Sequence, residues 1–162
     1  MKAVLISIRP KWVEKIVSGE KTLEVRKTRP KLETPFKCYI YCTGVKRSPL
    51  GEYVEVHRKT GGAVDEWQEK VIAEFVCDGI YPVCYTMDGF ADVVDCNHSC
   101  LKPSDFIAYG KGKPLYGWHI SGLKLYGEPK ELAQFDGLRE TRFGFELRQL
   151  ERPPQSWCYV EG

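Results

Sequence analysis

The sequence predicts an α+β fold that is mainly β, a small mixed β-barrel with short flanking helices. About six or seven short runs rich in β-branched and aromatic residues indicate strands, whereas two segments have helical patterns. One of these helices lies between the first two strands, and a doubly wound sheet would need a helix between most strands. With 43% hydrophobic and 28% charged residues, the 162-residue chain fits a single domain, 1–162, with an ordinary core.

The first elements are a strand, a helix and a second strand. Residues 3–8 are mostly apolar and β-branched, which predicts a strand. Pro10 suits the first turn and Gly19 the end of a short amphipathic helix whose apolar residues recur four apart. Residues 21–28 alternate between apolar and polar, which predicts the second strand.

The rest of the chain predicts strands, one further helix and two insertions. We expect strands at 38–43, 71–77, 115–125 and 143–150, and a short helix at 103–109. The segments at about 44–70 and 84–100 interrupt this pattern, and we interpret them as insertions in the single domain.

Apolar runs and cysteines indicate the compartment. No apolar run approaches the roughly 18–20 residues that span a bilayer, and the N-terminal run is too short for a signal peptide. We therefore expect a soluble cytoplasmic protein with no membrane partner. Seven cysteines without a secretory signal argue against a disulfide framework.

One cysteine-rich segment contains residues that could bind a metal ion. Cys84, Cys96, His98 and Cys100 are ligand-type residues, and structural zinc sites pair cysteines two to four residues apart. No second ligand pair follows, so we expect neither a metal nor another cofactor, although zinc binding by these four residues stays an open alternative.

Charge is divided unevenly along the chain. Residues 2–31 hold nine basic and three acidic residues, a net charge of +6, whereas the remainder, with fifteen basic and nineteen acidic, carries −4. This asymmetry favours a local anionic ligand, with a solvated charged surface as the alternative. Residues 74–105 are acidic instead, which leaves a protein-interaction domain as a further hypothesis.

The sharpest pattern is G-x-K-x-x-E-x-R at residues 19–26. Glu24 and Arg26 are two apart on a strand, so they share a face and can form an ion pair. Lys21 can bind phosphate as a point charge or, beside another cation, lose its proton and act as a base or nucleophile. The alternative is a surface ion pair worth under about 1 kcal/mol.

Ser7-Ile-Arg9-Pro10, the amphipathic helix and this motif together resemble the signature of the ASCH domain, a PUA-like family, and residues 153–159 resemble the tail of bacterial and phage members. The resemblance implies a PUA-like barrel that binds RNA, another nucleic acid or a nucleotide in a basic cleft. The residues assigned to that cleft are Ser7, Arg9, Lys21, Glu24 and Arg26, joined by Gln155 and Trp157 as candidate base contacts. We expect Lys21→Ala to leave the fold intact and to weaken binding.

The resemblance also raises an enzymatic hypothesis. One bacterial branch hydrolyses the amide of N4-acetylcytidine with a lysine, a threonine three residues later and a distant glutamate. This chain matches at Lys21 but has Glu24 at the threonine position, with Thr22 as the nearby hydroxyl. In such an enzyme, whether an amidohydrolase of a modified nucleoside or another nucleic-acid-processing activity, Lys21 would activate Thr22 or water, and Glu24 or Glu74 would transfer protons. Glu74 lies in an apolar strand, where a carboxylate is costly unless it is paired.

Three residues with aromatic rings are candidates for the core or for the binding site. Trp118 falls on an apolar periodicity and is expected in the core, and His119 beside it is expected to be a core histidine. Trp157 either stacks on a base or closes one end of the barrel.

Overall fold

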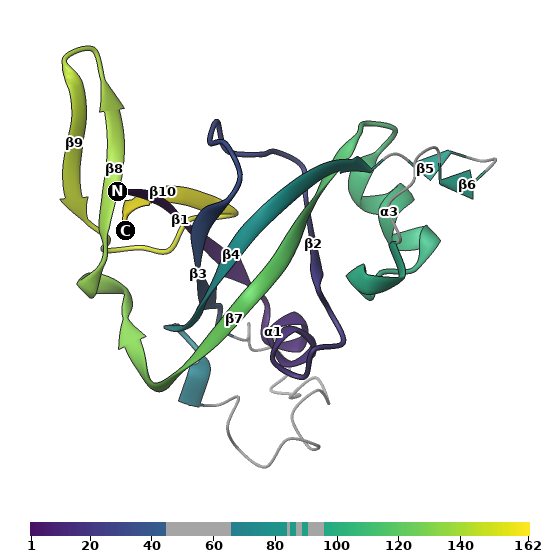
Figure 1. The fold of residues 1–162 in the computed structure, drawn as a ribbon, viewed down its shortest axis with the longest axis horizontal. Coiled ribbons are helices and arrows are strands. Elements are labelled where there is room, and N and C mark those ends of the chain that lie inside the picture. Colours follow the sequence, from purple (N-terminus) through teal and green to yellow (C-terminus); the bar gives the residue numbers. More distant parts are fainter. Residues whose placement is uncertain (45–65, 84, 87–88, 91–95) are drawn as a thin grey trace, which may run out of the picture.

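The structure is a computed structural model that describes residues 1–44, 66–83, 85–86, 89–90 and 96–162 (Figure 1). Most of the two expected insertions, at about 44–70 and 84–100, therefore lies outside the described residues. Among the described helices, none is long and apolar enough to cross a membrane.

The described chain is mainly β, with short helices beside the strands. In chain order its elements are β1 (Lys2–Ile8), α1 (Pro10–Val17), β2 (Leu23–Arg26), β3 (Phe36–Cys42), β4 (Lys70–Val83), β5 (Tyr85–Thr86), β6 (Gly89–Phe90), the 3₁₀ turn η1 (Cys96–Ser99), α3 (Pro103–Gly110), β7 (Leu115–Glu131), the 3₁₀ turn η2 (Leu132–Gln134), β8 (Asp136–Thr141), β9 (Gly144–Gln149) and β10 (Trp157–Glu161). This mixture confirms the predicted α+β class.

Eight described strands form one mixed sheet in the order β2-β7-β4-β3-β1-β10-β8-β9. β1 is parallel to β3, and the other ladders are antiparallel. The long strands β4 and β7 pair with several register shifts, and they run side by side across the molecule in Figure 1. The described ladders leave β2 at one edge and β9 at the other, so no backbone ladder among them closes the predicted barrel.

Apolar side chains pack on both faces of β1 and β3. The first core cluster consists of Val4, Ile6, Ile8, Val13, Ile16, Phe36, Cys38, Ile40, Cys42, Ile72, Ala73, Phe75, Cys77, Trp118 and Ile120. The second core cluster, on the opposite face, consists of Ala3, Leu5, Tyr39, Tyr41, Val71, Phe135 and Val160. Because successive strand residues point to opposite faces, β1 supplies both clusters, which explains its continuous apolar run.

Helix α1 sets the position of the motif. Pro10 begins the helix, where its missing N–H costs no hydrogen bond, and Val13 and Ile16 are buried in the first core cluster. Gly19 then adopts a φ of +80°, which favours glycine, and turns the chain out of the helix. The Lys21 amide donates to the Lys15 carbonyl, which directs the chain into β2.

The C-terminal third differs most from the prediction. β7 continues to Glu131 instead of ending near residue 125, and the expected strand at 143–150 is β9. β8 and β10 were not expected. β10 pairs with β1, so the two ends of the chain meet: the Gly162 amide donates to the Met1 carbonyl at 2.7 Å (Figure 1).

Candidate functional site

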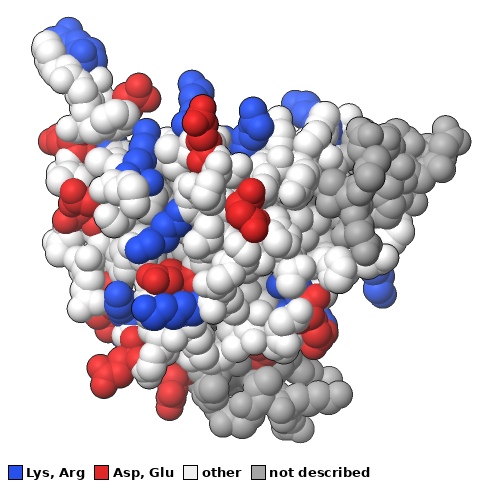
Figure 2. All heavy atoms as spheres, in the orientation of Figure 1, with Lys and Arg blue, Asp and Glu red and all other residues white. Residues whose placement is uncertain are grey.

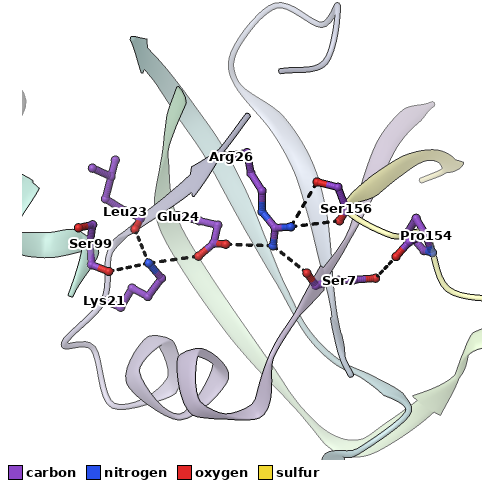
Figure 3. Close-up of polar contacts among 8 residues, drawn as sticks. All are labelled: Ser7, Lys21, Leu23, Glu24, Arg26, Ser99, Pro154 and Ser156. Carbon is purple, nitrogen blue, oxygen red and sulfur yellow. Dashed lines mark hydrogen bonds and ion pairs between the residues drawn. The ribbon is translucent and has the colours of Figure 1, made fainter. Parts of the chain in front are cut away.

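The charged residues of the motif meet in a buried chain of polar contacts (Figure 3). Lys21 Nζ lies 3.2 Å from Glu24 Oε2, and Arg26 Nη2 lies 2.9 Å from Glu24 Oε1. The side chains of Lys21, Glu24 and Arg26 are 2%, 8% and 10% exposed. The prediction that Glu24 and Arg26 share a face is confirmed, and their ion pair is buried instead of lying on the surface.

The Lys21 ammonium uses its three donors inside the protein. Besides its contact with Glu24, it donates to the carbonyls of Leu23 at 2.8 Å and Ser99 at 2.7 Å. Its Nζ also lies 5.3 Å from the ring centroid of Trp12 on α1. Lys21 therefore holds β2, η1 and α1 together, and in this conformation it offers no donor to an external phosphate.

Arg26 joins β2 to β1, with which β2 shares no described backbone ladder, and to the segment that precedes β10. Its Nη2 donates to the Ser7 carbonyl at 2.7 Å, and its Nη1 donates to Ser156 Oγ at 3.3 Å. Ser7 Oγ in turn donates to the Pro154 carbonyl at 2.7 Å. We call this boundary, made by Arg26, Ser7, Pro154 and Ser156, the β2–β1 seam, and Figure 3 shows it continuous with the Lys21–Glu24 contact.

Two buried donors of the described residues lack an acceptor: Arg26 Nε and Trp118 Nε1. Trp118 lies directly opposite Glu24 in the β2–β7 ladder, so both side chains are on one face of the sheet. Lys21 and Arg26 share the single carboxylate of Glu24, which leaves these three side chains with a net charge of +1. Such a cluster favours an oxygen acceptor or an anion nearby.

Exposed cations follow the buried cluster along the chain. We call residues 27–31 the basic segment, because Lys27, Arg29 and Lys31 in it are exposed. The Lys27 ammonium lies 4.8 Å from the ring centroid of Tyr109, and the Arg29 guanidinium lies 5.9 Å from that of Tyr116. Arg9, at the start of α1, is also exposed.

A pocket of about 600 Å³ adjoins the basic segment. Its lining comes from residues 29–34 and from Ile80 on β4. Leu32 and Ile80 pack against the first core cluster, so the pocket has an apolar side beside its basic residues. Its charged lining residues are Arg29, Lys31 and Glu33, so the lining mixes apolar, basic and acidic side chains.

Trp157 both packs on the core and contacts the basic segment. Its ring lies 5.9 Å from Trp118 and 5.4 Å from Tyr159, centroid to centroid, and Nε1 donates to Thr28 Oγ1 at 3.0 Å. The half-buried indole therefore covers part of the first core cluster. Gln155, two residues earlier, is exposed.

Glu74 lies apart from the motif. It is opposite Tyr39 in the β3–β4 ladder, and Tyr39 belongs to the second core cluster on the other face of the sheet. Glu74 Oε2 accepts a hydrogen bond of 2.6 Å from the Tyr126 hydroxyl, which lowers the pKa of Glu74, while burial raises the pKa of Tyr126. The structure thus does not bring Glu74 to Lys21.

Thr22 contributes backbone contacts to the site. Its amide donates to the His98 carbonyl at 3.0 Å, and its carbonyl accepts from the Ile120 amide at 2.8 Å. Thr22 therefore ties β2 to η1 and β7. Of the two carboxylates that the hydrolase hypothesis names for proton transfer, Glu24 lies beside Lys21 and Glu74 lies apart from it.

His119 departs from its expected place in the core. Its side chain is 43% exposed, and Nδ1 lies 2.6 Å from Asp78 Oδ1. This hydrogen bond lowers the pKa of Asp78. The apolar neighbours of His119 suggested burial, but alternation along β7 places Trp118 and His119 on opposite faces of the strand.

The structure describes the side chains of only two of the four candidate zinc ligands, His98 and Cys100. Cys84 and the side chain of Cys96 lie outside these residues, and the Cys100 thiol donates to the Glu20 carbonyl at 3.4 Å. In the described parts of the chain, no group of three His, Cys, Asp or Glu side chains has the arrangement of a metal site.

Comparisons with known proteins agree with this architecture. The model of the ASCH domain family matches residues 6–154. Among solved structures, ASCH from Zymomonas mobilis is similar with a TM-score of 0.54 at 18% identity, covering 98% of this chain and 87% of that one. A serine-to-alanine mutant of that protein has a TM-score of 0.58 at 20% identity, covering 98% and 88%.

A tyrosine-to-phenylalanine mutant of the same protein is similar with a TM-score of 0.54 at 18% identity, covering 99% of this chain and 91% of that one. No curated protein sequence matches significantly. At these identities the structural likeness demonstrates a shared fold. Because the family model spans most of the sequence and the fold agrees with it, the chain belongs to the ASCH domain family.

Proposed function

We propose that this protein binds single-stranded RNA on the surface of the basic segment, beside the buried motif, with Arg9 as a further candidate contact. The observation that carries the proposal is that Lys21 and Arg26 share one carboxylate, which leaves positive charge next to exposed cations. Membership of the ASCH family supports it, because this PUA-like fold is associated with RNA binding.

Buried and exposed cations have different roles in this proposal. Lys21 and Arg26 hold the strands in place and contribute to a positive local potential, which attracts an anionic chain. Arg9, Lys27 and Arg29 reach solvent and contact the phosphates.

Aromatic residues beside these cations provide stacking surfaces for bases. Tyr109 and Tyr116 lie within 6 Å of Lys27 and Arg29, respectively. Charge for the backbone and rings for the bases are the usual components of a single-strand site. The pocket lined by residues 29–34 has a volume within the range of small-ligand sites, so it suits one nucleotide of the strand.

The test is fluorescence anisotropy of a labelled single-stranded RNA over a salt series. Lys27→Gln/Arg29→Gln is expected to weaken binding at least about tenfold and to make the slope of log K against log salt shallower by about 1.4, at roughly 0.7 for each lost phosphate contact. Both side chains are exposed, so the fold should be unaffected.

Lys124→Gln/Lys130→Gln is the matched control, because it removes two exposed positive charges on β7. It should change the affinity less than about twofold. Equal binding by the wild type and the Lys27/Arg29 variant would refute the proposed surface. Single-stranded DNA of the same sequence and a free mononucleotide, used as competitors, distinguish the three ligand classes that the sequence left open.

A further inference from the structure

β9 is an edge strand with an unusually apolar exposed side. All six of its residues are exposed, with Phe145 at 56% and Leu147 at 50%. Within the described sheet β9 pairs with β8 on one side and ends the strand order on the other. An edge strand with free backbone groups and exposed apolar side chains is a template for pairing with another strand.

The ladder with β8 defines two faces of the hairpin. Leu138 pairs with Leu147 on one face, and Arg139 pairs with Glu146 on the other. Arg148 pairs with Gly137, which has no side chain to balance its charge. The outer edge therefore presents an apolar residue between an acidic and a basic one, in the order Glu146, Leu147, Arg148.

We propose that β9 pairs antiparallel with β9 of a second copy of this chain, about a two-fold axis at Leu147. In this register Leu147 lies beside the partner's Leu147, and each is already beside Leu138 of its own hairpin. Four leucines then form one row across four strands. Cross-strand apolar pairs of this kind stabilise an antiparallel sheet.

The same register also matches the charges. Glu146 lies opposite the partner's Arg148, and this contact occurs twice because of the two-fold symmetry. Glu146 is then flanked by Arg139 of its own hairpin and by an arginine of the second copy. An axis placed at Glu146 or Arg148 would instead bring two like charges together, which destabilises a sheet.

The hairpin tip offers a competing occupant, an RNA strand. Phe143 is 86% exposed, and the Arg142 guanidinium lies 4.7 Å from its ring centroid. Figure 1 shows the β8–β9 hairpin projecting from the body of the molecule, and Figure 2, in the same orientation, shows side chains of basic residues at its end. The complementarity lies along β9, however, where the Glu146 carboxylate would repel phosphate, so the second copy fits this edge better.

The proposed contact predicts a weak dimer. A ladder of six residues per copy covers less surface than the roughly 1,200–2,000 Å² of stable interfaces. The dimer should therefore form in a concentration-dependent equilibrium. Sedimentation velocity between about 5 and 500 µM covers the range of such weak association.

The wild type is expected to sediment faster as its concentration rises. Glu146→Arg should keep the chain monomeric, because it places arginine against the partner's Arg148. Glu146→Arg/Arg148→Glu should restore dimerisation, because the exchanged charges are again opposite. Glu128→Arg, the same change at an exposed position of β7, is the control and should dimerise like the wild type.

Three results would overturn the proposal. They are a monomer at every concentration, a dimer that Glu146→Arg leaves intact, and failure of the double variant to dimerise while its circular dichroism and melting temperature match the wild type. Phe143→Ser provides the remaining comparison. If this variant loses RNA affinity, and both it and the wild type sediment as monomers at every concentration, the hairpin binds RNA instead of a second copy.

Discussion

Lys21 is a buried cation whose three acceptors come from β2 and from η1, which is distant in sequence. The acceptors are the side chain of Glu24 and the carbonyls of Leu23 and Ser99. A side chain placed in this way contributes to the stability of the fold, in addition to any contribution it makes to ligand binding. The expectation that Lys21→Ala leaves the fold intact therefore needs revision.

We predict that Lys21→Ala lowers the free energy of unfolding by about 3–5 kcal/mol, the usual cost of removing one partner of a buried ion pair. Two buried carbonyls also lose their donor. Urea unfolding measures the change, with Lys27→Ala at an exposed position as the control, expected within about 0.5 kcal/mol. A loss below about 1 kcal/mol would contradict the structural role.

The Glu74–Tyr126 hydrogen bond predicts a pH-dependent stability. The pKa of Glu74 lies below 4.5, so its contribution is present at neutral pH and is lost as the pH falls through the folded-state value. Tyr126→Phe should lower the unfolding free energy by about 1–2 kcal/mol at pH 7 and by progressively less in acid.

The alkaline limb gives an independent check on the same residue. The pKa of Tyr126 is raised above 10, so the wild type should lose stability as the pH rises past 10, when the unfolded chain ionises first. Tyr126→Phe removes this loss. Guanidinium unfolding from pH 3 to 11 measures both limbs, and a stability difference that is constant with pH would contradict this assignment.

Alternation along the strand predicts some side-chain positions and leaves others open. It places Glu24 and Arg26 on one face, as observed. It cannot show that they are buried, because the contacts that cover them, at Ser99 and Ser156, are distant in sequence. Glu74 lies in a run that is apolar on both faces, so periodicity gave no indication of which face it occupies.

β2 is held on its two sides by different interactions. A backbone ladder joins it to β7, whereas the side chain of Arg26 joins it to β1 across the β2–β1 seam. A short strand held on one side by side-chain contacts should respond locally when these contacts are removed.

We predict that Arg26→Met speeds amide hydrogen exchange in β2 and in residues 154–157, because both lose contacts with the guanidinium. Exchange in β3, which lies between β1 and β4, should change much less. Mass spectrometry of deuterium uptake measures this, with Arg29→Met as the exposed control. Uniform acceleration across the sheet would show that the seam is not a local unit.

Elements with strong periodicity were predictable, and those with interrupted patterns were not. α1, α3, β1 and β3 follow their sequence patterns closely. β7 runs through Gly122 and Pro129, which indicate breaks, and its register shifts against β4 accommodate the irregularity. β8 has the sequence DGLRET, whose polar residues suit an exposed hairpin but give no apolar alternation.

The two core clusters share β1 and β3, so they should not unfold independently. Val4 and Ile6 pack in the first cluster, while Leu5 between them packs in the second. We therefore expect the described residues to unfold as one cooperative unit, because the two clusters share these strands.

We predict a single thermal transition for the whole chain. Tryptophan fluorescence reports on the first cluster through Trp118 and Trp157, and far-ultraviolet circular dichroism reports on the sheet. The two probes should give the same midpoint, as a two-state domain requires. Separate midpoints would mean that the clusters belong to independent folding units.

The contact between Met1 and Gly162 has a consequence for how this domain can be combined with others. The Gly162 amide bonds to the Met1 carbonyl, so the chain enters and leaves the fold at one point. Neighbouring strands are about 5 Å apart, a gap that a tight turn of a host protein also spans. The domain is therefore suited to insertion into a surface loop of another protein, because neither its own fold nor that of the host has to be distorted. For the same reason it is suited to circular permutation.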